Sequence, residues 1–127
     1  MTTTNSFNTF ISVARDCPTF VGEVPPIRNS KTVARIEYDL LIDDPYRFTS
    51  DDVLYIANGE WRGLSRDEFF AQTQPDFRLS SLTQRYGWGV HSDVQGRIAL
   101  YGVGSLGYEM LARDALLRQL RAYRSRR

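Results

Sequence analysis

The sequence predicts a small α+β domain in which three to four strands form an antiparallel sheet and helices pack mainly on one face. Three observations predict this class. Alternating β-forming residues occur near the start and in the last third of the chain, and helical patterns lie mostly between them. The strands do not alternate with helices in the βαβ order of a parallel sheet. At 127 residues the chain has the length of one domain, so we expect residues 1–127 to form a single unit.

The first third of the chain predicts a strand, a long loop and a helix. Residues 7–14 (FNTFISVA) are rich in β-formers and predict the first strand. Residues 15–31 contain three prolines, which exclude a regular hydrogen-bond ladder, so we expect a loop there. Ser30 is a suitable cap for a helix from Lys31 to about Ile42. The expected apolar face of that helix consists of Val33, Ile36, Leu40 and Leu41.

Capping signals predict the middle helices. Thr49 followed by Asp52 precedes a helix over residues 50–57, and Ser65 followed by Glu68 precedes a short helix that ends near residue 72. Residues 75–84 are expected to be irregular or briefly helical.

The strongest local pattern is a β-hairpin in RYGWGVHSDVQGRIALYG, residues 85–102. Its arms are residues 86–91 and 97–101, which flank a turn-forming SDVQG segment. Ser105 is then a suitable cap for a helix over residues 106–113. Residues 114–124 fit either a helix or a terminal strand, because helix-forming residues also alternate there.

Four sequence blocks carry a resemblance to a known family: NTFISVARDCP, VARIEYDLL, PYRFTSDDVL and RYGWGVHSDVQGRIALYG. Together with the ending AYRSRR, they resemble a family of short bacterial proteins known as a domain of unknown function. The resemblance spans nearly the whole chain and favours a strand before the basic ending. It implies no activity, cofactor or partner.

Composition and charge narrow the classes of partner. The apolar fraction of 42% and the charged fraction of 24% are typical of a globular protein without a membrane span. One cysteine and an N-terminus without a basic segment before its apolar part predict a cytoplasmic location. The segment 113–127 holds six arginines and one acid, a charge of +5, so the other 112 residues sum to −4 against the total of +1.

The sequence favours a non-enzymatic binding or interaction protein, for which a homodimer is one option. The expected functional surface joins the Asp16–Pro26 loop to a strand that carries Gly87, Gly89 and His91, because both segments contain residues that set backbone shape. A protein or a small molecule would be the partner. The candidate binding residues are Asp16, Pro18, Arg85, Tyr86, Trp88 and His91.

The alternative is an enzyme in which Cys17 is the nucleophile and His91 its base, oriented by Asp93. His91 is the only histidine, so a cysteine nucleophile would depend on it. The competing interpretation makes Cys17 a core residue and lets the glycines accommodate an aromatic side chain such as Phe10.

A further alternative is weak nucleic-acid binding through the arginine-rich end, in which Tyr123 would stack on a base. The pI near 7.9 and the acidic body count against a dedicated nucleic-acid protein. One histidine and one cysteine give no metal-ligand spacing. GVGSLG at 102–107 has the spacing of a dinucleotide-binding loop but no βαβ unit follows it, so we expect neither a metal nor a cofactor.

Overall fold

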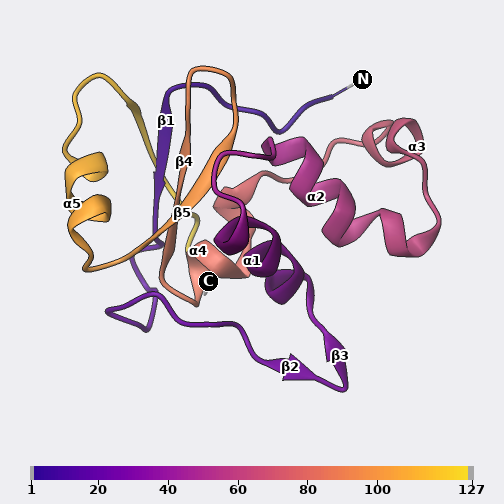
Figure 1. Cartoon of the computed structure of the whole chain (residues 1–127), viewed down its shortest axis with the longest axis horizontal. Coiled ribbons are helices and arrows are strands. Elements are labelled where there is room, and N and C mark those ends of the chain that lie inside the picture. The colour runs from indigo at the N-terminus through magenta and orange to yellow at the C-terminus, as the bar shows by residue number, and fades with distance from the viewer. Residues whose placement is uncertain (1, 126–127) are drawn as a thin grey trace.

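The structure is a computed structural model that describes residues 2–125. Its main sheet has the strand order β5-β4-β1-β6 (Figure 1). The strands are β1 (Thr9–Ser12), β4 (Trp88–Ser92), β5 (Ile98–Gly102) and β6 (Arg118–Arg121), and a separate two-stranded ribbon joins β2 (Ile27–Arg28) to β3 (Ser30–Lys31). The α+β class is confirmed.

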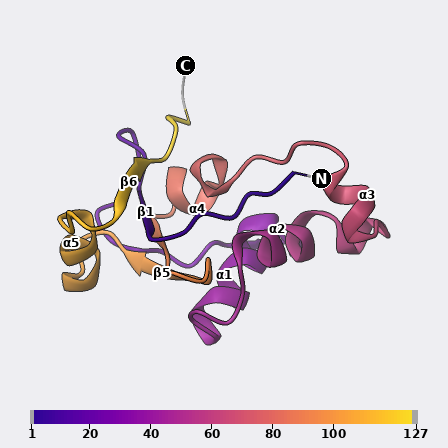
Figure 2. The same ribbon diagram turned by 90° about the horizontal axis from the view of Figure 1, so that it is seen from above.

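The sheet is mixed because its last strand runs parallel to its first. β4 lies antiparallel to both β1 and β5, as the hairpin pattern predicted. β6 lies beside β1 on its other edge (Figure 2). The two strands run parallel, with Phe10 opposite Gln119. The ambiguous segment is therefore a strand, and the expectation of a purely antiparallel sheet is corrected at this one edge.

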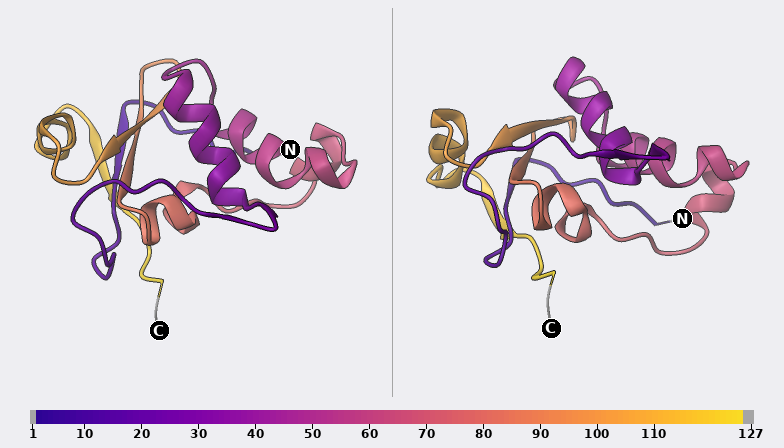
Figure 3. Two further views of the ribbon diagram at one scale, coloured as in Figure 1. Left: turned by 60° about the horizontal axis from the view of Figure 1, so that its bottom comes forward. Right: turned by 90° about the horizontal axis from the view of Figure 1, so that it is seen from below.

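The helices lie on both sides of the sheet, with most of them on one side. They are α1 (Val33–Asp43), α2 (Ser50–Asn58), α3 (Arg66–Phe70), α4 (Ser81–Gln84) and α5 (Leu106–Ala112), with the 3-10 turns η1 (Glu60–Arg62) and η2 (Phe77–Leu79). α1, α2 and α4 build the larger core together with Ile11, Val90 and Ile98 of the sheet. α5 covers the opposite face of the sheet (Figure 3). Its Tyr108 packs there on Phe10 of β1.

The side-chain caps explain where most helices begin. Thr49 and Asp52 form a capping box at α2, and Ser65 and Glu68 form another at α3, as predicted. Ser105 caps α5. The cap predicted for α1 is wrong: Thr32, not Ser30, accepts the first-turn N–H, because Ser30 pairs with Arg28 in the β2–β3 ribbon.

The apolar face predicted for α1 is also shifted around the helix. Its buried residues are Ala34, Glu37 and Leu41, whereas Val33 is 39% exposed. The buried stripe thus runs at the helical positions i, i+3 and i+7, with a carboxylate in its centre.

The first residues are held against α2 by a buried carboxylate. Asp51 accepts hydrogen bonds from the hydroxyls of Thr3 and Thr4 and from the Thr4 N–H.

Within residues 2–125, no helix is long and apolar enough to cross a membrane.

Candidate functional site

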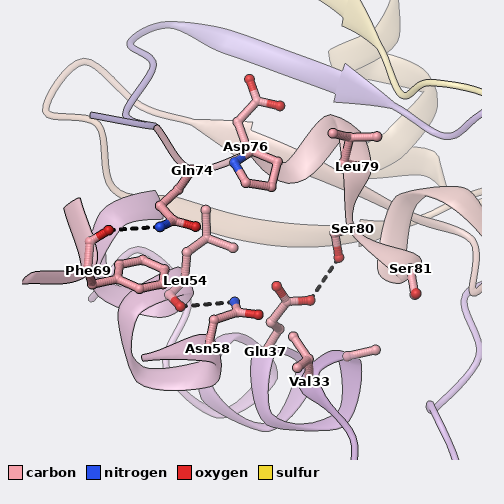
Figure 4. Close-up of a pocket in the computed structure, with 12 residues that line it drawn as sticks. Val33, Glu37, Leu54, Asn58, Phe69, Gln74, Asp76, Leu79, Ser80 and Ser81 are labelled. Atoms are coloured by element: carbon pink, nitrogen blue, oxygen red, sulfur yellow. Dashed lines mark hydrogen bonds between the residues drawn. The ribbon is translucent and has the colours of Figure 1, made fainter. Parts of the chain in front are cut away.

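The helices α1, α2 and α3 and the segment before α4 line a partly open cavity of about 200 Å³ (Figure 4). Its walls combine apolar and polar side chains. They are Val33, Ala34, Glu37, Leu54, Asn58, Phe69, Gln74, Pro75, Asp76, Leu79, Ser80 and Ser81. We call this cavity the Glu37 pocket.

Glu37 is the most unusual group in the pocket because it is a carboxylic acid only 2% exposed. Ser80 Oγ donates a hydrogen bond of 2.8 Å to one carboxylate oxygen. The same Oγ accepts the Leu82 N–H as the cap of α4, which fixes the direction of the serine hydroxyl. The second oxygen of Glu37 has no hydrogen-bond donor among the described residues and borders the cavity.

Burial dominates the proton affinity of Glu37. Removal from water penalises the charged form and raises the pKa of the carboxyl to about 7, while the Ser80 hydrogen bond partly opposes that rise. Both protonation states are therefore populated near neutral pH. A group with this property in a cavity is a candidate functional residue.

The rest of the pocket offers hydrogen-bond acceptors. Asn58 Nδ2 donates to the Leu54 carbonyl and Gln74 Nε2 donates to the Phe69 carbonyl, so the amide oxygens of Asn58 and Gln74 remain available. Asp76 adds a second carboxylate, which accepts the Arg78 N–H. The lining contains no lysine, arginine or histidine, so its charge is negative or neutral. This arrangement fits a ligand that donates hydrogen bonds and carries positive charge.

His91 lies in a different place, on the face of the sheet toward α5. Its Nδ1 lies 2.7 Å from Tyr46 Oη, which in turn lies 2.7 Å from Tyr101 Oη. Tyr46 adopts a left-handed backbone conformation with φ of 61°. Its backbone N–H donates to the carbonyl of Ile98 in the edge strand β5. Burial lowers the pKa of His91, and the negative charges of Asp93 and Asp114 partly oppose that shift. The Tyr46 hydroxyl thus joins the His91 ring and the Tyr101 hydroxyl in one chain of side-chain hydrogen bonds.

The structure does not join Cys17 to His91. Phe10 is the residue opposite His91 in the sheet, and Cys17 follows the far end of β1, where it packs half-buried against both core clusters. No hydrogen bond links the two side chains among the described residues. Asp93, the proposed orienting group, accepts the backbone N–H groups of Gln95 and Arg97 in the hairpin turn.

The glycines of the hairpin make room for this protein's own atoms. A Cβ on Gly89 would lie 2.6 Å from the Phe10 ring and 2.8 Å from that of Tyr108. This agrees with the competing interpretation, in which the glycines accommodate an aromatic side chain such as Phe10. Gly87 has φ of 80° and precedes β4, where the loop around Val21 contacts it. Neither glycine opens the strand to a ligand in this conformation.

The 16–26 loop lies against the start of β4. The Glu23 N–H donates to the Tyr86 carbonyl, and Trp88 Nε1 donates to the Glu23 carbonyl, each at 2.8 Å. Asp16 holds the end of the described chain through Ser125, and Pro18 is exposed. The expected contact between the loop and residues 86–88 therefore exists, at the opposite end of β4 from His91.

The basic end is partly folded onto the domain. Arg121 donates to the Val13 carbonyl, and the ring of Tyr123 is covered by Arg78, whose guanidinium carbon lies 4.1 Å from the ring centroid. The last two arginines of the proposed nucleic-acid segment lie outside the described residues.

Comparison with known proteins identifies a family without identifying an activity. The model of a family of unknown function, DUF6157, matches residues 1–127, so the chain belongs to that family. No curated protein and no solved structure matches the chain.

Proposed function

We propose that this member of the DUF6157 family is a binding protein for a small molecule that places an ammonium group against Glu37. The observation that carries the proposal is a buried carboxylate with one oxygen facing a cavity and no basic side chain in the lining. A buried carboxylate without a compensating charge is costly in free energy. An ammonium group would supply the missing positive charge and donate to the free oxygen.

The other walls support a small amine in particular. The amide oxygens of Asn58 and Gln74 can accept the remaining ammonium N–H groups. Val33, Leu54 and Phe69 offer apolar surface to a short carbon chain. A cavity of about 200 Å³ is smaller than a drug-sized site, so we expect only a small group to enter it.

The same lining favours binding over catalysis. It holds no histidine, cysteine or basic residue, and its other carboxylate, Asp76, already accepts the Arg78 N–H rather than contacting Glu37. General acid–base work usually needs a second positioned group on the substrate's other side. A carboxylate that recognises charge requires no such partner.

The test is a calorimetric titration of n-butylamine at pH 8, where Glu37 is mostly ionised. We expect wild type to bind and Glu37→Gln to bind about tenfold more weakly or less, because a charge-assisted hydrogen bond is lost. Glu60→Gln is the matched control, since Glu60 is exposed on η1 and outside the lining. Equal affinity of wild type and Glu37→Gln, or no binding by wild type, would overturn the proposal.

A second candidate is a homodimer contact through the 16–26 loop. The observation that favours it is an exposed apolar group on an anchored loop: Phe20 is 90% exposed, Val21 59% and Val24 54%. Surfaces of this kind often mark protein contacts. Sedimentation of wild type and Phe20→Ser tests this candidate. A concentration-dependent dimer that Phe20→Ser abolishes supports it, and a wild-type monomer at all concentrations refutes it.

We place this activity in the bacterial cytoplasm. A single cysteine outside any disulfide supports a reducing compartment. Fractionation of a bacterial host that carries the natural gene would test it.

A further inference from the structure

A second cavity of about 270 Å³ adjoins the Glu37 pocket. It is lined by Arg28, Thr32, Val33, Ala34, Ser81, Arg85 and Tyr86. Three of these residues, Val33, Ala34 and Ser81, also line the Glu37 pocket. The two cavities are therefore neighbours on either side of a common wall, and we call the second one the arginine pocket.

The charges of the two cavities are opposite. The arginine pocket contains two guanidinium groups and no acidic side chain, whereas the Glu37 pocket contains two carboxylates and no basic side chain. Neither Arg28 nor Arg85 forms an ion pair or a side-chain hydrogen bond with any residue of the described range. By contrast, Arg35 nearby on α1 is paired with Asp39. The arginine pocket thus presents positive charge that the protein itself leaves uncompensated.

The helix geometry explains how opposite charges come close. On α1, Ala34 belongs to the common wall, and Glu37 follows it by three residues, a rise of about 4.5 Å along the helix. On α4, Ser81 belongs to the common wall, and Arg85 follows it by four residues at the C-terminal cap. The wall between the charges carries the side chains of Val33 and Ala34, which suit an aliphatic segment.

The amino end of α1 adds to the positive potential of the arginine pocket. Thr32 caps this helix of 11 residues, and its first residues form the common wall. The unpaired N–H groups of a first helical turn favour nearby anions. This effect reinforces the two arginines and does not replace them.

We propose that the ligand is a zwitterion whose ammonium group binds Glu37 and whose carboxylate or phosphate group binds Arg28 and Arg85, with a short aliphatic chain across Val33 and Ala34. This inference rests on the proposed function and specifies its ligand class. Arginine is well suited to the anionic end, because its guanidinium pairs with carboxylate and phosphate through two parallel hydrogen bonds.

The experiment compares three probes by calorimetry at pH 8: 4-aminobutyrate, n-butylamine and butyrate. They share the same chain length and differ in which charged ends they carry. We expect 4-aminobutyrate to bind wild type at least about tenfold more tightly than either single-charge probe, because each end adds a charge-assisted contact. A fourth probe, phosphoethanolamine, carries a phosphate in place of the carboxylate on a shorter aliphatic chain, and it shows which of the two anionic groups the arginine pocket binds.

Variants at the arginine pocket separate this inference from the proposed function. Arg85→Gln and the double variant Arg28→Gln/Arg85→Gln should reduce the affinity for 4-aminobutyrate to that for n-butylamine, and they should not weaken n-butylamine binding, because that probe has no anionic end. Arg118→Gln is the matched control, because Arg118 is exposed on β6 and lines neither pocket. All three sites are exposed, so the variants are expected to fold, and thermal unfolding checks this.

If n-butylamine binds as tightly as both zwitterions and the arginine variants change nothing, the zwitterion inference is wrong and the amine-binding function stands. If butyrate alone binds as tightly as 4-aminobutyrate, the ligand is an anion and the zwitterion inference is also wrong. If wild type binds none of the probes, the proposed function fails, and this inference fails with it.

Discussion

The replacement Glu37→Gln should change how the stability of the protein depends on pH. Glutamine keeps the shape of the side chain and can still accept the Ser80 hydroxyl, but it cannot ionise. The pKa of Glu37 is raised from 4.5 to about 7 in the folded protein. The folded state therefore binds a proton more tightly than the unfolded state, and the associated stability is present below pH 4.5 and lost as pH rises through 7.

The size of the effect follows from the two pKa values. The difference between 7 and 4.5, multiplied by about 1.4 kcal/mol for each pH unit, gives about 3 kcal/mol. Wild type should lose stability from this group between pH 5 and pH 8, and Glu37→Gln should not. Because other carboxyl groups titrate in both proteins, the difference between the two curves isolates Glu37.

Urea unfolding at pH 5, 6, 7 and 8 measures this difference. We expect Glu37→Gln to gain stability relative to wild type as the pH rises, by about 2 to 3 kcal/mol over the range. Glu60→Gln should run parallel to wild type, since Glu60 is exposed. Parallel curves for wild type and Glu37→Gln would refute the claim that burial dominates the ionisation of this carboxyl.

Three further outcomes follow from the same structure. Affinity for n-butylamine should rise from pH 5 to pH 8 with a midpoint near 7, because only ionised Glu37 attracts an ammonium group. A constant affinity by calorimetry over this range would contradict that role. The alkylation rate of Cys17 by iodoacetamide should be the same in wild type and His91→Ala, since the imidazole is bonded elsewhere; a pronounced slowing in the variant would restore the dyad. Gly89→Ala should lower the free energy of unfolding by about 1–3 kcal/mol, because the added methyl overlaps two rings; an unchanged urea midpoint would show that the rings move freely.

The elements that were predictable from sequence are those that local chemistry determines. The hairpin of β4 and β5 depends on alternation and a turn within a few residues, and the caps at Thr49, Ser65 and Ser105 act on the next turn of chain. The terminal strand β6 was ambiguous because its helix-forming residues are overruled by pairing with β1, which lies more than a hundred residues earlier.

The Glu37 pocket could not be predicted, because its walls come from separate segments of the chain. A glutamate in a helix is ordinarily assigned to the solvent side. The one available signal was that Ala34 and Leu41 flank Glu37 at helical spacing, which places it in an apolar stripe. That stripe was missed because Val33, Ile36 and Leu40 form a competing and more hydrophobic face.

The side chains of Cys17, His91 and Asp93 are not hydrogen-bonded to one another among the described residues, for a related reason. Sequence patterns placed each residue on or beside a strand, but they did not specify the register of β1 against β4. That register sets Phe10 opposite His91 and leaves Cys17 beyond the strand end. A shift in pairing would be needed to bring the thiol to the imidazole.

The most direct test of the account is to follow the side-chain carboxyl carbon of Glu37 by NMR as a function of pH, with and without n-butylamine. We expect a midpoint near 7 in the free protein and a lower midpoint when the amine is present, because a bound cation favours the ionised carboxylate. A midpoint near 4.5 in the free protein, or one that the amine does not move, would contradict the role assigned to Glu37.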